Sequence, residues 1–306
     1  MRVLKPDDSY LSPSDKKIIE ERAIKMLHRA DAWDRFPVPV DDILEAANLK
    51  VAPKSMFDPA AILSYLKNKA SDVENKIKSA VSKVFGIYDA GENTIHIDDT
   101  VVVTKQNFLK LHETGHHDIP THRKIFRFFQ DCKQTLSPEI ADQFEREANN
   151  FARYIMFKGD TFGEHAADHE FGIKTPMKLA KQFGASLYAS SREYARTNNR
   201  ACAVFILEPM QFVPKSGAEA HVRRVEVSPS FSEQFGLPKD QIINEDHYLW
   251  SAVPIGRKMT RPTPIRIKDK NGQIHECLAE AFDTTYNILV LLYPVKELQP
   301  KVFMAS

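Results

Sequence analysis

Along the first two thirds of the chain, apolar residues recur mostly with the three-to-four-residue period of an α-helix. Residues 12–33 begin with Ser-Pro-Ser, a typical helix start, and carry an apolar stripe on one face. That stripe consists of Ile18, Ile19, Ala23 and Met26. Residues 36–51 predict an extended proline segment, a short helix and the start of a strand, and residues 60–84 predict a charged helix.

A hairpin and two longer helices are expected in the middle of the chain. Two β-prone runs, 84–88 and 94–97, flank a turn that contains glycine, which predicts a hairpin. Apolar spacing predicts a helix over residues 104–117. A second helix over residues 137–157 has Ser137 as its expected N-cap, with proline next to it.

The pattern changes twice after residue 160. Residues 161–200 predict short helices, two of them on either side of Gly184, and residues 201–306 contain mainly β-prone runs. An Asn-Gly pair at residues 271–272, between alternating runs, is a strong hairpin signal. We therefore expect an α+β protein: a domain over residues 1–160, a helical extension over 161–200 and a β-rich, regulatory C-terminal domain over 201–306.

Composition excludes several classes of protein. The 306 residues include 42 Lys and Arg against 41 Asp and Glu, so no overall charge favours nucleic acid. Three widely spaced cysteines, Cys132, Cys202 and Cys277, do not predict a disulfide framework. The chain begins without an apolar signal region and has no run of about 18 apolar residues. We expect a cytoplasmic protein without a membrane partner.

The segment His-Glu-Thr-Gly-His-His, residues 112–117, has the spacing of a catalytic metal site. In a helix His112 and His116 lie on one face, where both can bind one cation at roughly 2.0–2.1 Å. Glu113 is turned by about 100° around the axis, so it can reach a water bound to that metal and accept its proton. The competing interpretation is a solvated helix face, since His is frequent in this chain, with 11 residues.

A catalytic zinc site needs a third protein ligand, and two glutamates of the 137–157 helix are candidates. Glu145 and Glu147 both border its apolar stripe, and helical phase does not choose between them. Glu145 is favoured because it borders the side with small residues, where another helix can approach closely. Asn149, four residues further, could hydrogen-bond a ligating histidine. Glu147 remains the alternative third ligand.

Other polar residues near the motif could assist catalysis. His117 and His122 follow it directly, and Tyr154 lies on the same helix as the third ligand. Each could stabilise the oxyanion that forms when water attacks a peptide carbonyl, and each has an alternative as an exposed or packed residue. His165 and His169, also four apart, lack a following glutamate and are interpreted as a solvated surface.

The two motifs together resemble the ImmA/IrrE family of zinc metallopeptidases. That family has an HExxH motif followed by a helix of the form E-x-x-A-N-x-F-A, here "HETGHH" and "EREANNFA". The resemblance extends over most of residues 15–207. Departures are Thr114 in place of a more usual Leu, charged flanks at Lys110 and Asp118, and "IMFKGD" in place of a Leu-Met-Pro-like end.

The resemblance implies a gluzincin-like fold with one zinc ion per chain, held by His112, His116 and Glu145, and with Glu113 as general base. Characterised members cleave helix-turn-helix transcriptional repressors, so a repressor-type protein is the expected substrate. We expect it to bind as an extended strand along an edge strand that ends at Ile97.

Residues 175–197 suggest a different class of function. Two short helices around Gly184 match a helix-turn-helix, and basic residues could contact phosphates: Lys178, Lys181, Arg192, Arg196 and Arg200. Packing against the rest of the protein, or docking of the substrate, is favoured over DNA binding because the net charge is only +1. The alternative function is a DNA-binding or partner-binding regulator, including an antitoxin-like one, with a vestigial or structural metal site.

Overall fold

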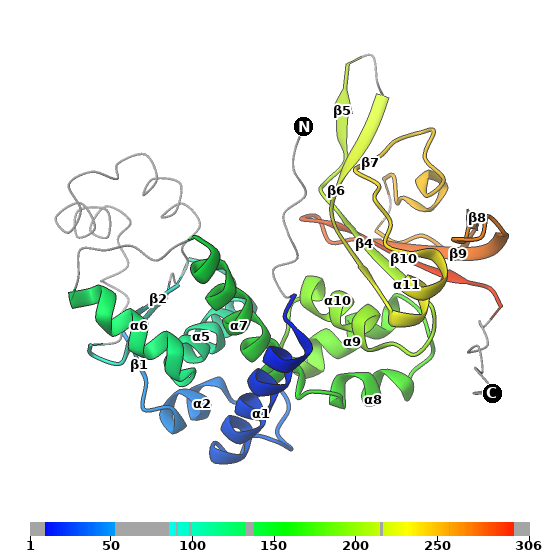
Figure 1. Cartoon of the computed structure of the whole chain (residues 1–306). Coiled ribbons are helices and arrows are strands. Elements are labelled where there is room, and N and C mark those ends of the chain that lie inside the picture. Colours follow the sequence, from blue (N-terminus) through cyan, green and yellow to red (C-terminus); the bar gives the residue numbers. More distant parts are fainter. Residues whose placement is uncertain are drawn as a thin grey trace. The chain divides into compact units, whose positions relative to one another are not determined.

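The computed structural model describes residues 10–52, 86–89, 91–97, 100–131, 138–214, 217–256 and 258–296. The chain divides into two compact units (Figure 1). Among the described residues, the first comprises those from 10 to 159 together with 182–185, and the second comprises 160–181 and those from 186 onward. The helix expected over residues 60–84, and Ser137 with Cys132, lie outside the described residues.

The first unit is mostly helical, with a small sheet. Its elements are α1 (Pro13–Arg29), α2 (Val40–Ala46), β1 (Lys50–Val51), β2 (Gly86–Asp89), β3 (Thr94–Ile97), α5 (Val103–Asp118), α6 (Pro120–Asp131) and α7 (Pro138–Phe157). Ser12 caps α1 by accepting a hydrogen bond from the backbone N–H of Asp15. Of the predicted stripe, three residues are buried and Ile18 is exposed.

The small sheet corrects one expectation about the substrate. Its strand order is β1-β3-β2, with β1 parallel and β2 antiparallel to β3. The strand that ends at Ile97 is therefore the central strand and not an edge strand, because β1 covers its other side at Thr94 and Ile95. The outer strands of this sheet are β1 and β2.

Helix α6 was not predicted from the sequence. It begins at Pro120, immediately after α5 ends at Asp118, and Ile119 alone separates the two helices. Proline at the first helical position is a start signal, because its missing N–H is not needed there. The site depends on this helix, since it positions His122.

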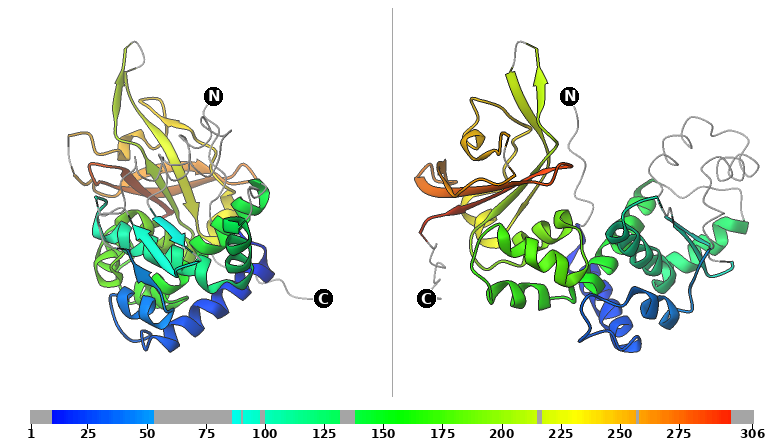
Figure 2. Two further views of the ribbon diagram at one scale, coloured as in Figure 1. Left: turned by 90° about the vertical axis from the view of Figure 1, so that its left-hand side faces the viewer. Right: turned by 180° about the vertical axis from the view of Figure 1, so that it is seen from behind.

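In the residues that the structure describes, the second unit combines four α-helices with a curled antiparallel sheet. Its elements are α8 (Thr161–Ala167), α9 (Lys174–Phe183), α10 (Leu187–Thr197), β4 (Ala203–Leu207), β5 (Gln211–Val213), β6 (Gly217–Val227), α11 (Pro229–Phe235), β7 (Ile242–Ile243), a 3-10 turn (Trp250–Ala252), β8 (Thr263–Lys268), β9 (Ile274–Asp283) and β10 (Ile288–Pro294). The strand order is β5-β6-β4-β10-β9-β8, with β7 paired to β6. The predicted α+β class is confirmed, and the β5–β6 hairpin extends beyond the rest of the sheet (Figure 2).

The sheet is held by an apolar core on alternate strand positions. Every residue of β4 and β10 is buried, as expected for strands at the centre of a sheet. In β9 the alternate residues Cys277, Ala279 and Ala281 face this core. The Asn271-Gly272 signal is confirmed as the turn between β8 and β9, with Gly272 at φ +81°.

The predicted helix pair around Gly184 exists, and its second helix packs within the second unit. Gly184 has φ +64°, and Ser186 caps α10 by accepting from the N–H of Ala189. Helix α10 lies against α8 and strands β4 and β6, so 161–200 and 201–306 are not separate compact units. None of the helices that the structure describes is both long and apolar enough to cross a membrane.

Two of the proposed phosphate contacts are already engaged. Arg192 and Arg196 both bind the carboxylate of Glu226 on β6, at 2.9 and 2.8 Å. Arg200 stacks over the ring of Phe171, with 4.3 Å from guanidinium to ring centroid. No residue of α10 is exposed, which differs from a recognition helix that must reach a DNA groove.

Candidate metal centre

The site is built where helices α5 and α7 pack closely. A methyl group added at Gly115 would lie 3.2 Å from the Cα of Ala148 and 3.2 Å from the ring of Phe151, so the glycine permits this approach. Ala148 and Phe151 are fully buried. The small residues on both helices therefore bring the α5 histidines against the first half of α7.

Three donor atoms of these helices converge. The Nε2 atoms of His112 and His116 are 3.1 Å apart. Glu145 on α7 places one carboxylate oxygen 3.4 Å from the Nε2 of His112 and the other 3.5 Å from that of His116. This group could hold a metal ion. Glu147 is not part of the convergent set.

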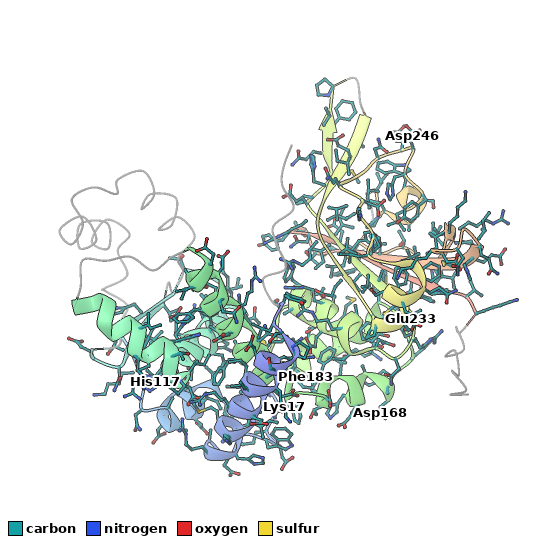
Figure 3. All side chains as sticks on the ribbon, viewed as in Figure 1. Lys17, His117, Asp168, Phe183, Glu233 and Asp246 are labelled. Carbon is teal, nitrogen blue, oxygen red and sulfur yellow. The ribbon has the colours of Figure 1, made fainter. Side chains whose placement is uncertain are left out.

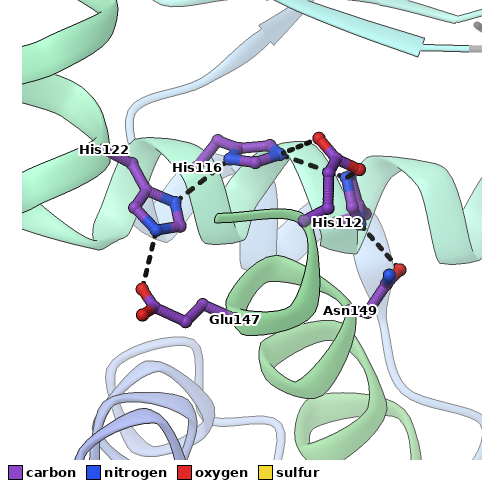
Figure 4. Close-up of polar contacts among 6 residues, drawn as sticks. His112, His116, His122, Glu147 and Asn149 are labelled. Atoms are coloured by element: carbon purple, nitrogen blue, oxygen red, sulfur yellow. Dashed lines mark hydrogen bonds and ion pairs between the residues drawn. The ribbon is translucent and has the colours of Figure 1, made fainter. Parts of the chain in front are cut away.

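Hydrogen bonds on the far side of each ring fix which nitrogen carries the proton. The Nδ1 of His112 lies 3.1 Å from the carboxamide oxygen of Asn149 (Figure 4). An amide oxygen can only accept, so His112 carries its proton on Nδ1 and keeps the lone pair of Nε2 towards the cluster. This is the contact expected for Asn149, and it is a common support for a metal-binding histidine.

His116 is supported by a relay through two more side chains. Glu147 lies 2.7 Å from the Nε2 of His122, and the Nδ1 of His122 lies 3.1 Å from the Nδ1 of His116 (Figure 4). The carboxylate accepts from Nε2–H of His122, so the Nδ1 of His122 can accept in turn from Nδ1–H of His116. The lone pair of the His116 Nε2 then also points into the cluster.

Two lone pairs and a carboxylate at this separation repel one another unless a positive charge lies between them. Two ligand atoms at ~2.0–2.1 Å from a tetrahedral zinc ion are about 3.3 Å apart. The observed separations of 3.1, 3.4 and 3.5 Å fit this value. The residues present therefore suit a small divalent cation with three protein ligands.

The protonation equilibria of the cluster are shifted in the directions that this geometry requires. Burial lowers the pKa of His112, but hydrogen bonding to Glu145 and the charge of Glu113 outweigh it and raise that pKa above the usual value. Burial and the charges of the neighbouring histidines lower the pKa of His116 to about 4. Partial burial opposes ionisation of Glu145, yet hydrogen bonds from both histidines hold its pKa well below the usual range. The surroundings that raise the pKa of His112 and lower that of Glu145 would also favour a cation between these groups.

Glu113 is held differently from Glu145. Its side chain is buried, and burial raises the pKa of its carboxyl to about 7, with the charge of Glu145 acting in the same direction and that of His112 against it. A carboxyl group with a pKa near neutrality can accept and return a proton at physiological pH. The two glutamates of the site therefore differ: Glu145 is ionised, and Glu113 can exchange a proton near neutral pH.

The cluster is open on one side. The side chains of His112 and His116 are 10% and 4% exposed, whereas that of Glu145 is 60% exposed. Structural zinc sites are closed by four protein ligands, and catalytic ones keep a position open for water or substrate. The described residues offer three candidate ligands, one of them an exposed carboxylate, which is the number found in sites of the second type.

Comparison with family profiles found no match to this sequence, and comparison with curated proteins found none. Among solved structures, a Mycobacterium tuberculosis transcriptional regulator is similar, with 12% sequence identity and a TM-score of 0.47. The match covers 93% of this chain and 76% of that one. At this level the likeness assigns no function, so the function must be argued from the site itself.

The expected oxyanion stabilisers lie away from the open side of the cluster. His122 is completely buried and is used in the relay behind His116. His117 is directed to β2, with its Nδ1 2.7 Å from the hydroxyl of Tyr88. Tyr154 comes nine residues after Glu145, so it is about 13 Å further along α7 and about half a turn around it. The contacts of His117 and His122 therefore lend no support to an oxyanion role for them.

The charged residues flanking the motif have partners away from the metal cluster. Lys110 lies 3.3 Å from the carboxylate of Asp41, and Asp118 lies 2.9 Å from the guanidinium of Arg22. Lys158, the charged residue in place of the usual end of α7, is buried and donates to the backbone oxygens of Trp33 and Arg35. These charged residues therefore have partners of their own outside the candidate metal site.

Metal affinity is expected to fall as the pH is lowered from about 8 to about 5.5. The raised pKa of His112 means that its proton competes with the metal below that pKa, and each displaced proton weakens affinity about tenfold per pH unit. Competition with a chelator, corrected for the chelator's own protonation, measures this at several pH values. An affinity that stays constant over the range would contradict the assignment of His112 as a ligand.

Proposed function

We propose that the chain is a zinc-dependent endopeptidase with a gluzincin-like site. The observation that carries the proposal is the convergence of three donor atoms, with both histidine lone pairs directed inward by their hydrogen bonds. A buried glutamate with a pKa of about 7 beside these ligands adds the group that hydrolysis needs.

Each residue has one role in this proposal. His112, His116 and Glu145 would hold zinc, which when bound polarises a peptide carbonyl and acidifies a water molecule. Glu113 accepts the proton of the attacking water and delivers it to the leaving amine nitrogen, so that its carboxylate is regenerated. Asn149, and the pair His122 and Glu147, keep the two imidazoles in the tautomer that binds metal.

The proposed substrate is a repressor-type protein, which follows from the resemblance of the two motifs to the ImmA/IrrE family. We propose that the cleaved segment binds in an extended form. Since β3 is central in its sheet, strand addition is assigned to β2, the longer of the two outer strands.

A DNA-binding regulator is the competing function, and the packing of α10 argues against it. Its basic residues Arg192 and Arg196 neutralise Glu226 and are not directed to a ligand. A further alternative is a protein that binds a partner without cleaving it. Such a protein would not need Glu113, yet Glu113 is buried at a cost in free energy, which favours a function for its carboxyl group.

The test begins with metal content, measured by mass spectrometry on untagged protein prepared without added zinc. We expect about one zinc per chain. The protein is then incubated with a repressor-type protein encoded beside it, and the products are identified by mass. Zinc binding with a defined cleavage site supports the proposal. A chain that stays metal-free when zinc is offered refutes it.

A further inference from the structure

A cavity of about 470 Å³ lies in the first unit, beside the end of α5 and away from the face that holds the metal cluster. It is bordered by α1, the end of α2, the end of α5 and the start of α6 (Figure 1). Figure 3 marks His117, one of the residues on its wall. The wall consists of Arg22, Arg29, Ala46, Ala47, Asn48, His117, Asp118, Pro120, Arg123 and Lys124.

The wall carries more positive than negative charge. Four of its residues are arginine or lysine, and Asp118 is the one carboxylate among them. Asp118 is shared by two of the cations: its carboxylate lies 2.9 Å from Arg22 and 3.8 Å from Arg29. The one carboxylate therefore neutralises at most one of these two guanidinium groups, and Arg123 and Lys124 add two further positive charges.

Arg123 and Lys124 supply the surplus. Arg123 stands at the end of the first turn of α6 and Lys124 follows it, and neither has an ion-pair partner among the described residues of the chain. Two adjacent cations that are not neutralised, in a hollow that already contains two more, repel one another. This arrangement costs free energy in the empty state and is relieved by an anion.

We propose that this cavity binds a small molecule that carries a phosphate group. A phosphate has the charge to offset the surplus and several oxygens to accept hydrogen bonds from guanidinium groups, which bind it in a fork-like, bidentate manner. Pockets that bind small molecules have volumes of about 300–1,000 Å³, so there is room for an organic part beside the phosphate. The short apolar residues Ala46, Ala47 and Pro120 border that room.

The cavity and the metal cluster share one helix but not one function. His116 faces the cluster and His117 faces the cavity wall, on consecutive positions of α5. A metal cation has no ligand set among the positively charged residues of the cavity. The ligand is therefore neither the metal nor a peptide bound at it, and its binding can be measured without any peptidase assay.

The probes are adenosine 5′-monophosphate and inorganic phosphate, titrated calorimetrically into the full chain at a constant ionic strength of about 150 mM. The variant Arg123→Gln/Lys124→Gln removes the two surplus cations. The matched control Lys16→Gln/Lys17→Gln removes two exposed cations from α1 outside the wall. Circular dichroism and zinc content show whether both variants keep the fold.

We expect binding of the nucleotide to weaken at least about tenfold in the α6 variant and to change less than about twofold in the α1 control. Tighter binding of the nucleotide than of phosphate identifies an organic phosphate as the ligand, whereas equal binding identifies free phosphate. The proposal is overturned if neither probe binds the unaltered chain, or if both variants weaken binding equally. It is also overturned if a correctly folded α6 variant binds as well as the unaltered chain, since the anion would then be held elsewhere, for example at the metal.

Discussion

Replacing Glu113 with glutamine is expected to leave zinc bound and to lower the rate of peptide cleavage by about 10²–10⁴-fold. Glutamine has the same shape but cannot accept and return a proton near pH 7. The residue is not one of the three convergent ligands, so the metal content should stay near that of the unaltered chain. The measurement pairs initial cleavage rates with zinc content on the same preparations.

Stability of the metal-free protein gives this substitution a second readout. Burial raises the pKa of Glu113 from 4.5 to about 7, so the carboxyl favours folding when protonated and loses that contribution as the pH rises through about 7. Above pH 7 the glutamine variant should therefore unfold less readily, by up to about 3 kcal/mol. Urea unfolding at about pH 5 and about pH 8 tests the sign, since the gain should appear only at the higher pH.

Glu21→Gln is the matched control, because Glu21 is an exposed glutamate on α1. It should change neither cleavage rate nor stability. A Glu113→Gln protein with the rate of this control would remove Glu113 from the mechanism. Loss of zinc from Glu113→Gln would instead indicate that Glu113 is a metal ligand. The roles of Glu113 and Glu145 would then have to be exchanged.

The parts of the site that depend on helical geometry could be predicted from the sequence. His112 and His116 are four residues apart on one helix, so their convergence follows from the helix repeat itself. The preference for Glu145 came from the small residues of α7, and Gly115 does approach Ala148 closely. Asn149 lies on the same face of α7 as Glu145, which brings it to His112.

The parts of the site that depend on tertiary packing could not be predicted from the sequence. The relay from Glu147 through His122 to His116 needs a helix break between α5 and α6, and the only sequence signal for it is Pro120. The edge position of the strand ending at Ile97 was wrong because the strand start expected near residue 51, β1, gives no sequence signal for the strand that it pairs with. Oxyanion roles for His117 and Tyr154 were inferred from proximity in sequence, which says little about the direction of a side chain.

The apparent uncertainty between Glu145 and Glu147 has a structural explanation. Both glutamates belong to the candidate site but make different contacts: Glu145 lies near the Nε2 atoms of His112 and His116, and Glu147 binds His122. Glu145 thus lies on the Nε2 side of His116, whereas Glu147 is linked through His122 to its Nδ1 side. Sequence periodicity cannot separate a ligand from the carboxylate that orients a ligand, because both must border the same buried stripe.

Alanine at these two positions is accordingly expected to weaken zinc binding by different amounts. The binding free energy of about 10–16 kcal/mol at four-ligand zinc sites corresponds to roughly 3 kcal/mol per ligand, so Glu145→Ala should lose about 10²–10³-fold in affinity. Loss of an outer partner costs about 10–100-fold, which is the expectation for Glu147→Ala. Competition with a chromogenic chelator on untagged protein measures both.

The glutamine variants sharpen the comparison. The amide oxygen of Glu147→Gln can still accept the hydrogen bond from His122, so this variant should bind zinc within about threefold of the unaltered chain. Glu145→Gln loses a charged ligand and should stay close to Glu145→Ala, since a neutral amide oxygen is a poor zinc donor. The reverse ranking, with Glu147→Gln losing the metal and Glu145→Gln retaining it, would make Glu147 the third ligand.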